Sequence, residues 1–188
     1  MTASARTALT GVRVFDGDVI SADGDTAGAS SVDTGGAVLI PGLIDAHVHV
    51  DSRGTLEALA AWGVTTALDM ACWPASLVDS LRNVPGLTDI RSAGLPAIGP
   101  HGPHAQFPNM PSAAIVLTVE HAKAFVAARV AEGSDYIKIV LEDPGNGGLS
   151  QGVADTVVAQ VARRRHEGRR SCRGAGGLRH GSCTLART

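Results

Sequence analysis

The 188-residue chain is poor in aromatic side chains and in cysteine. Aromatic residues make up 3% of it against 44% hydrophobic residues in all, so Val, Ala, Leu and Ile have to fill its core. The three cysteines, Cys72, Cys172 and Cys183, are odd in number and form no C-x-x-C pair, which argues against a disulfide framework or a zinc finger. No apolar run approaches the ~20 residues that cross a bilayer, and the N-terminus lacks the apolar segment of a signal peptide. We therefore expect a cytoplasmic protein with no membrane partner.

Charge is distributed unevenly along the chain. Residues 1–162 carry 8 Lys+Arg and 17 Asp+Glu, a net −9, while residues 163–188 carry 8 Arg and one Glu, a net +7. This last segment mixes Arg, Gly, Ser and Cys and shows neither strand nor helix periodicity. We expect it to be disordered, or to be unrelated sequence that follows a frameshift near Glu167. A nucleic-acid arm is the weaker interpretation, because no aromatic residues alternate with the arginines for base stacking.

Between Val38 and Ala162 short apolar segments alternate with helical patterns, which predicts an α/β fold. Four strand–helix units in succession imply a parallel sheet with right-handed crossovers. Ligand-binding groups in such folds gather at the carboxyl ends of the strands. Residues 1–37 contain short alternating strands and turns, which predicts a small β-subdomain. The strands of the four units are expected over 37–50, 64–70, 89–98 and 135–141, and the helices over 55–63, 74–86, 118–133 and 153–165.

The stretch "LIDAHVHVD", residues 43–51, places two histidines one residue apart at the end of an apolar run. Side chains alternate faces along a strand, so His47 and His49 should project from the same face. Two neutral imidazoles on one face can chelate a metal ion. The alternative is a strand end that simply reaches water.

A lysine, Lys138, lies inside the apolar stretch "SDYIKIVLED". An unpaired ammonium in a buried strand is costly, because burial disfavours the charged form. The lysine could extend to water or pair with Asp69 or Glu142. Alternatively it is deprotonated and reacts with carbon dioxide to give a carbamate, an anionic oxygen ligand for metal ions.

The stretches "LIPGLIDAHVHVD", "GVTTALDM" and "EGSDYIKIVLED" together resemble the metal-dependent amidohydrolase superfamily, in particular its imidazolonepropionase-like and Xaa-Pro dipeptidase-like branch. The resemblance runs through most of residues 8–162 and implies a partial (β/α)8 barrel, about the first four units, with a remnant of the flanking N-terminal β-sandwich. The expected parts are a partial β-sandwich segment over 1–37, the N-terminal half of a hydrolase barrel over 38–162 and the tail over 163–188.

The resemblance also implies a site. His47 and His49 would bind one divalent metal, usually zinc, and Lys138, as a CO2-derived carbamate, would bridge two. A metal-activated hydroxide would then attack the carbonyl of a C–N bond in a small amide, cyclic amide or dipeptide-like substrate. The family's later ligands, two histidines after the fifth and sixth strands and an aspartate after the eighth, have no counterpart here.

Other polar residues near the strand ends have open roles. His101 and His104 lie in the long loop "GPHGPHAQFPNMPSA", residues 99–113, and could contact substrate, serve as extra metal ligands or be merely solvated. Asp45 could orient a histidine or pair within the barrel floor. Asp69 could contact Lys138 or form a structural ion pair.

Two functions remain open from the sequence. The first is a metal-dependent amidohydrolase, here as a truncated chain. The second is a catalytically inactive half-barrel that binds metal weakly or self-associates as a homo-oligomer, because half of a barrel leaves apolar sheet surface uncovered.

Overall fold

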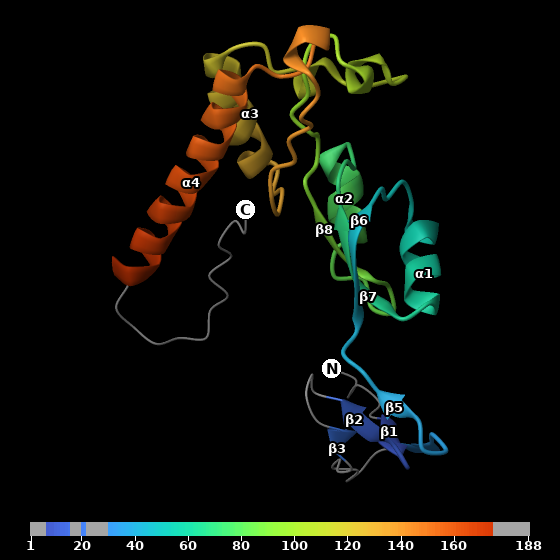
Figure 1. Cartoon of the computed structure of the whole chain (residues 1–188). Coiled ribbons are helices and arrows are strands. Elements are labelled where there is room, and N and C mark those ends of the chain that lie inside the picture. Colours follow the sequence, from blue (N-terminus) through green and yellow to red (C-terminus); the bar gives the residue numbers. More distant parts are fainter. Residues whose placement is uncertain (1–6, 16–19, 22–29, 175–188) are drawn as a thin grey trace. The chain divides into compact units, whose positions relative to one another are not determined.

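The computed structural model describes residues 7–15, 20–21 and 30–174 (Figure 1). Contacts divide the chain into two compact units, Met1–Leu43 and Ile44–Thr188. The sequence places this boundary after residue 37 instead. The difference arises because Val38–Leu39 pairs with a strand of the first unit.

The described part of the first unit consists of short strands and turns. Strand β1 (Thr7–Thr10) pairs in parallel with β4 (Ser30–Asp33). A second sheet has the order β3-β2-β5, in which β2 (Arg13–Phe15) lies antiparallel to β3 (Ile20–Ser21) and parallel to β5 (Val38–Leu39). These are the small sheets that the alternating pattern of residues 1–37 predicts; residues 1–6, 16–19 and 22–29 lie outside the described part.

The second unit begins with two strand–helix units and a third strand. Strands β6 (Leu43–Val48), β7 (Val64–Asp69) and β8 (Asp89–Ser92) form one sheet in that order. Strand β7 pairs in parallel with β8 in the register Thr66↔Asp89 to Asp69↔Ser92. The connections are helices α1 (Arg53–Ala61), which contacts β7, and α2 (Ala75–Leu81), which contacts β8 (Figure 1).

A hydrophobic cluster holds these helices to the sheet. Leu56 of α1 and Leu81 of α2 are buried against Ala67 and Ile90, whose side chains are also fully covered. Helix α1 ends before Gly63, which has a φ of +80° and so adopts the left-handed conformation that glycine tolerates best. The apolar spacing and the glycine therefore account for both the helix and its end.

The prediction of a fourth strand over residues 135–141 is wrong, because these residues do not form a regular strand. This segment forms only an isolated parallel bridge, Ala97↔Ile139, in which the amide of Ala97 donates to the carbonyl of Lys138 at 2.8 Å. The third strand itself ends at Ser92 because Gly94 (φ +63°) and Pro96 interrupt the ladder. The fourth segment nevertheless lies beside the third, as the order of units predicts.

Helix α3 (Val119–Ala131) begins where the sequence predicts. The side chain of Thr118 accepts a hydrogen bond from the amide of His121 at 3.2 Å, which caps the helix. Ala122, Phe125 and Val126 of its apolar face are buried. Short 3-10 turns, η1 (Pro103–Gln106) and η2 (Ser112–Ala114), occupy the long loop before it, and η3 (Pro144–Asn146) precedes α4.

Helix α4 (Gln151–Gly174), which contacts α3, extends well past the expected range 153–165. Disorder was the expectation from residue 163 onward, but residues 163–174 are helical, because this stretch contains several good helix formers, Arg and Glu, and no proline. Residues 175–188 of the expected tail lie outside the described part.

The described residues form a mixed α/β fold, and the three-stranded sheet within them does not close into a barrel. Nor does any helix among them combine the length and the apolar character needed to span a bilayer.

Candidate functional site

The two histidines of the H-x-H stretch lie side by side at the end of β6. Their ring centroids are 5.6 Å apart with an interplanar angle of 57°, and both rings line the same cavity. Asp45 does not orient either ring in this structure: its Oδ1 accepts a hydrogen bond from the backbone amide of His47 at 3.0 Å. The carboxylate therefore fixes the strand backbone below the rings.

The cavity has a volume of about 570 Å³ and lies at the carboxyl ends of the strands. Histidines 47 and 49 come from β6 and the segment just after it, and Met70 and Trp73 from the segment that follows β7. The remaining walls are Pro96, the loop residues His104, Phe107 and Met110, and the segment 138–141. Most of these side chains are apolar, so the few nitrogen-bearing groups stand out chemically.

Lys138 contributes its side chain to this cavity and is half-buried. It forms no ion pair with any described residue, so the alternative that it pairs with Asp69 or Glu142 is wrong. The reason is that both carboxylates are engaged elsewhere: Asp69 with Val50 and Ser92, and Glu142 with His104.

Asp69 joins three successive segments of the sheet. Its carboxylate is buried and accepts hydrogen bonds from the amide of Val50 at 2.9 Å and from the hydroxyl of Ser92 at 2.6 Å. Its own carbonyl accepts the hydroxyl of Tyr136 at 2.6 Å, and that hydroxyl also reaches the carbonyl of Arg91 at 3.1 Å. Asp69 is thus a structural residue whose bonds tie the strand ends together.

Burial raises the pKa of the Tyr136 phenol above its usual range, and the negative charges of Asp69 and Asp135 raise it further. The phenol therefore remains a neutral hydrogen-bond donor at physiological pH. This protonation state is the one that its two carbonyl partners require.

The structure separates the two loop histidines. His104 lines the cavity, whereas His101 is exposed and does not. The backbone amides of His101 and Gly102 both donate to the carbonyl of Gly147 at 3.0 Å, which joins the loop after β8 to the segment before α4. His101 thus contributes its backbone to the loop contact.

Sequence reasoning names Glu142 only as a possible partner of Lys138, whereas the structure pairs it with His104. Its Oε1 lies 2.6 Å from Nδ1 of His104 and also accepts the backbone amide of that residue at 3.1 Å. Its position directly after the fourth strand segment is the one sequence signal that pointed to it. The two residues are 38 positions apart in the sequence, so no local pattern predicts their contact.

No family model matches this chain. Short parts of it resemble two curated relatives: an allantoinase of Streptomyces avermitilis, 41% identical over 68 residues, and an allantoinase of Arabidopsis thaliana, 50% identical over 48 residues. These matches cover 30% and 21% of this chain and only 15% and 10% of those proteins.

Solved structures match over much more of the chain. A prolidase complexed with N-methylphosphonate-L-proline aligns with a TM-score of 0.61 and 20% identity, over 82% of this chain and 53% of that one. A Xaa-Pro dipeptidase with bound methionine aligns with a TM-score of 0.62 and 18% identity. An amidohydrolase aligns with a TM-score of 0.63 and 16% identity. Each of these alignments covers 84% of this chain and 54% of the other. Over most of its length the chain therefore shares the fold of these solved proteins. It spans about half the length of these solved chains.

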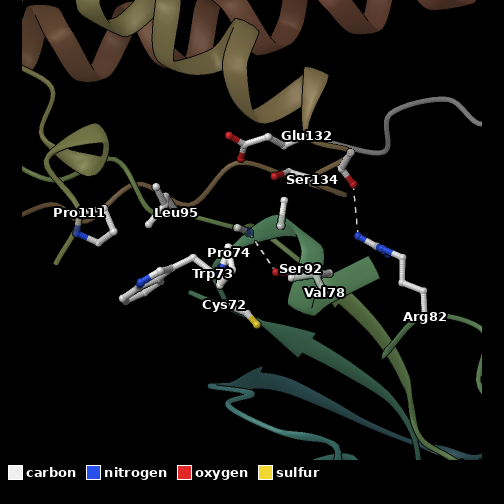
Figure 2. Close-up of a pocket in the computed structure, with 13 residues that line it drawn as sticks. Cys72, Trp73, Pro74, Val78, Arg82, Ser92, Leu95, Pro111, Glu132 and Ser134 are labelled. Atoms are coloured by element: carbon white, nitrogen blue, oxygen red, sulfur yellow. Dashed lines mark hydrogen bonds between the residues drawn. The ribbon is translucent and has the colours of Figure 1, made fainter. Parts of the chain in front are cut away.

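A second, smaller cavity of about 210 Å³ lies in the same unit and shares Trp73 with the first (Figure 2). It is formed by α2, the segment after β8 and the turn that follows α3. Figure 2 shows Arg82 extended toward the segment that carries Ser134; its guanidinium donates to the carbonyl of Gly133 at 3.2 Å and pairs with Asp135 at 2.7 Å. The guanidinium of Arg82 is thus bonded to the segment that follows α3. We assign this cavity no ligand.

Proposed function

We propose that this chain is part of a metal-dependent amidohydrolase that hydrolyses a C–N bond of an amide or cyclic amide. The observation that carries the proposal is that His47 and His49, at the end of β6, and Lys138, in the segment beside Ala97, line one cavity. The likeness to allantoinases, prolidases and an amidohydrolase supports the same class of reaction. The proposed architecture is the N-terminal half of a (β/α)8 barrel with part of a flanking β-sandwich.

The donor set fits a divalent metal such as zinc. His47 and His49 supply two imidazole nitrogens on one face, which is the ligand type that zinc prefers. The described residues contain no group of three or more His, Cys, Asp or Glu side chains arranged to hold a metal, so a third ligand from this part of the chain would be another kind of group. Lys138 can supply it by reacting with carbon dioxide: its neutral amine forms the N–C bond of a carbamate and releases a proton.

A bound metal would polarise the substrate carbonyl and activate a water molecule for attack. The chain's own contributions are distinct from this. His47 and His49 would hold the metal at the end of β6, and the half-buried apolar side chains of Trp73 and Met110 would limit the access of bulk water. The size of the cavity suits a small amide or a dipeptide-like substrate.

Metal content per chain, measured on protein purified without chelator, tests this proposal. We expect zinc in the wild-type protein and its loss in His47→Ala/His49→Ala, together with loss of any hydrolysis of cyclic or linear amides. His121→Ala is the matched control, because His121 is exposed on α3 and lies outside the cavity. Zinc that stays at the wild-type level in the double variant would refute the assignment.

Exposed apolar side chains favour a second candidate, an inactive chain that self-associates. Ile44 of β6 is 64% exposed, and the cavity residues Phe107 and Leu141 are 55% and 75% exposed. Such surfaces promote association with another chain. Sedimentation of the purified protein distinguishes the two candidates when it is combined with the zinc measurement: concentration-dependent dimers without zinc would favour this one.

A further inference from the structure

The imidazole of His104 is fixed by two neighbours. Its Nδ1 lies 2.6 Å from Oε1 of Glu142, and the same oxygen accepts the backbone amide of His104 at 3.1 Å. The ring of Phe107 packs edge-on against it, with centroids 5.2 Å apart and an interplanar angle of 66°. One carboxylate oxygen thus anchors both the backbone and the ring, and the aromatic contact restricts rotation.

This arrangement decides which ring nitrogen carries the proton. An ionised carboxylate can only accept hydrogen bonds, so Nδ1 has to be the donor. In a neutral imidazole the lone pair is then on Nε2, the ring nitrogen that the Glu142 contact leaves available. His104 lines the cavity, and Nε2 is the ring nitrogen that its contact with Glu142 leaves for a ligand.

Glu142 is itself held in place. Its side chain is 13% exposed, and its Oε2 is buried without a hydrogen-bond partner among the described residues. The segment that follows is tied to the His104 loop by the two amides that donate to the carbonyl of Gly147. The pair therefore lies where two loops are joined by backbone hydrogen bonds.

The composition of the cavity makes His104 a candidate hydrogen-bond acceptor for a ligand. Among the described residues that line it, only His47, His49, His104, Lys138 and Trp73 carry nitrogen in their side chains. Three of these are assigned to the metal under the proposed function, and an indole N–H only donates. An amide N–H that enters this apolar cavity needs an acceptor, which Nε2 of His104 supplies.

We propose that Glu142 is a positioning residue that holds His104 as the Nδ1–H tautomer, so that Nε2 accepts a hydrogen bond from an N–H group of an amide or cyclic amide ligand. The choice of ligand class rests on the proposed function. The positioning role of Glu142 rests only on its hydrogen bonds to His104. The positioning role and the ligand class can therefore be refuted separately.

Long-range 1H–15N correlation spectra of the full chain show directly which ring nitrogen of His104 carries the proton. The signals of His104 are assigned as those that disappear in His104→Gln. We expect the Nδ1–H form in the wild type and a shift to the Nε2–H form in Glu142→Ala, because free neutral imidazole favours Nε2–H. Glu142→Gln should keep the Nδ1–H form, since its amide oxygen can still accept. The control is Asp143→Asn, whose carboxylate bonds only to Gly145 and Asn146 among described residues. An Nε2–H wild type, or an unchanged tautomer in Glu142→Ala, would overturn the positioning role.

A pair of probes tests the ligand contact. Hydantoin, a small cyclic amide with two N–H groups, should shift the Nε2 signal of His104, and 1,3-dimethylhydantoin, which has none, should leave it in place. The cavity is large enough for both. In Glu142→Ala we expect hydantoin to bind about tenfold more weakly, the size of one hydrogen bond. Equal shifts with both probes, or none with either, in metal-free and zinc-loaded protein would overturn the ligand contact.

The zinc measurement keeps the two proposals apart. If the wild-type protein holds no zinc but His104 is the Nδ1–H tautomer, the proposed metal site is refuted and Glu142 remains the positioning residue of His104. Intact zinc binding with an Nε2–H tautomer in the wild type would refute only the inference made here.

Discussion

The backbone of Gly102 packs directly against the carboxylate of Glu142, and a Cβ at position 102 would overlap Oε2 of that side chain. Gly102 has a φ of −67°, which any residue can adopt, so the requirement for glycine here is steric and does not arise from the backbone conformation. The glycine therefore makes room for the residue that holds His104.

Gly102→Ala should displace Glu142 and break its bond to His104. We expect the Nδ1–H tautomer of His104 to be lost, as in Glu142→Ala, and stability to fall by about 1–3 kcal/mol because an overpacked site has to shift. The tautomer spectra and urea unfolding measure the two effects. Gly152→Ala is the control, since a Cβ there meets nothing within 4 Å and alanine favours the helix. An intact His104–Glu142 contact in Gly102→Ala would contradict the expectation.

Asp69→Ala should destabilise the second unit strongly. The substitution leaves the amide of Val50 and the hydroxyl of Ser92 without their buried acceptor, at a cost of about 2–4 kcal/mol in the free energy of unfolding. Asp69→Asn should cost less, because its amide oxygen can still accept from Val50. Urea denaturation measures both.

The control for Asp69 is Asp79→Ala. Asp79 is 67% exposed and lies 3.9 Å from Arg82, so its removal should change stability by at most about 0.5 kcal/mol. Similar losses at positions 69 and 79 would show that the buried bonds of Asp69 do not hold the strand ends.

Tyr136 should make the fold sensitive to alkaline pH. Its pKa is raised in the folded chain by burial and by the nearby carboxylates, so its stabilising effect is complete below the unfolded value of about 10 and is lost as the pH rises above that value. Tyr136→Phe should cost about 1–2 kcal/mol at pH 8 through loss of two hydrogen bonds. The difference between wild type and variant should shrink from pH 9 to 11.5 in unfolding curves. A constant difference over this range would count against the raised pKa.

Local sequence signals were sufficient for most helices. The expected ranges 118–133 and 64–70 match α3 and β7 closely, because the cap residue Thr118, the spacing of Phe125 and Val126 and the β-branched residues of β7 act over a few positions. The same holds for the shared face of His47 and His49. Alternation along a strand is a local property.

Contacts between loops were not predictable in the same way. The pairing of Glu142 with His104 depends on how two loops meet, and their close approach requires Gly102 and Gly147, where added side chains would collide. The early end of β8 has a related cause: Gly94 and Pro96 outweighed the apolar pattern of residues 89–98. Tertiary packing decided both features, and it leaves no periodic trace in the sequence.

Cys72 should be almost inert to alkylation in the folded chain. Burial, with the negative charges of Asp69 and Asp51 as lesser causes, raises the pKa of its thiol from 9.0 to about 11, and the residue is only 2% exposed. The thiolate fraction at pH 8 falls by about a hundredfold, so iodoacetamide should react at least that much more slowly than with the urea-unfolded chain. A Cys172→Ser/Cys183→Ser variant leaves Cys72 as the single target, and mass spectrometry follows its modification. Comparable rates in the folded and unfolded chain would mean that the loop after β7 opens readily, and the cavity wall at Trp73 would then be mobile too.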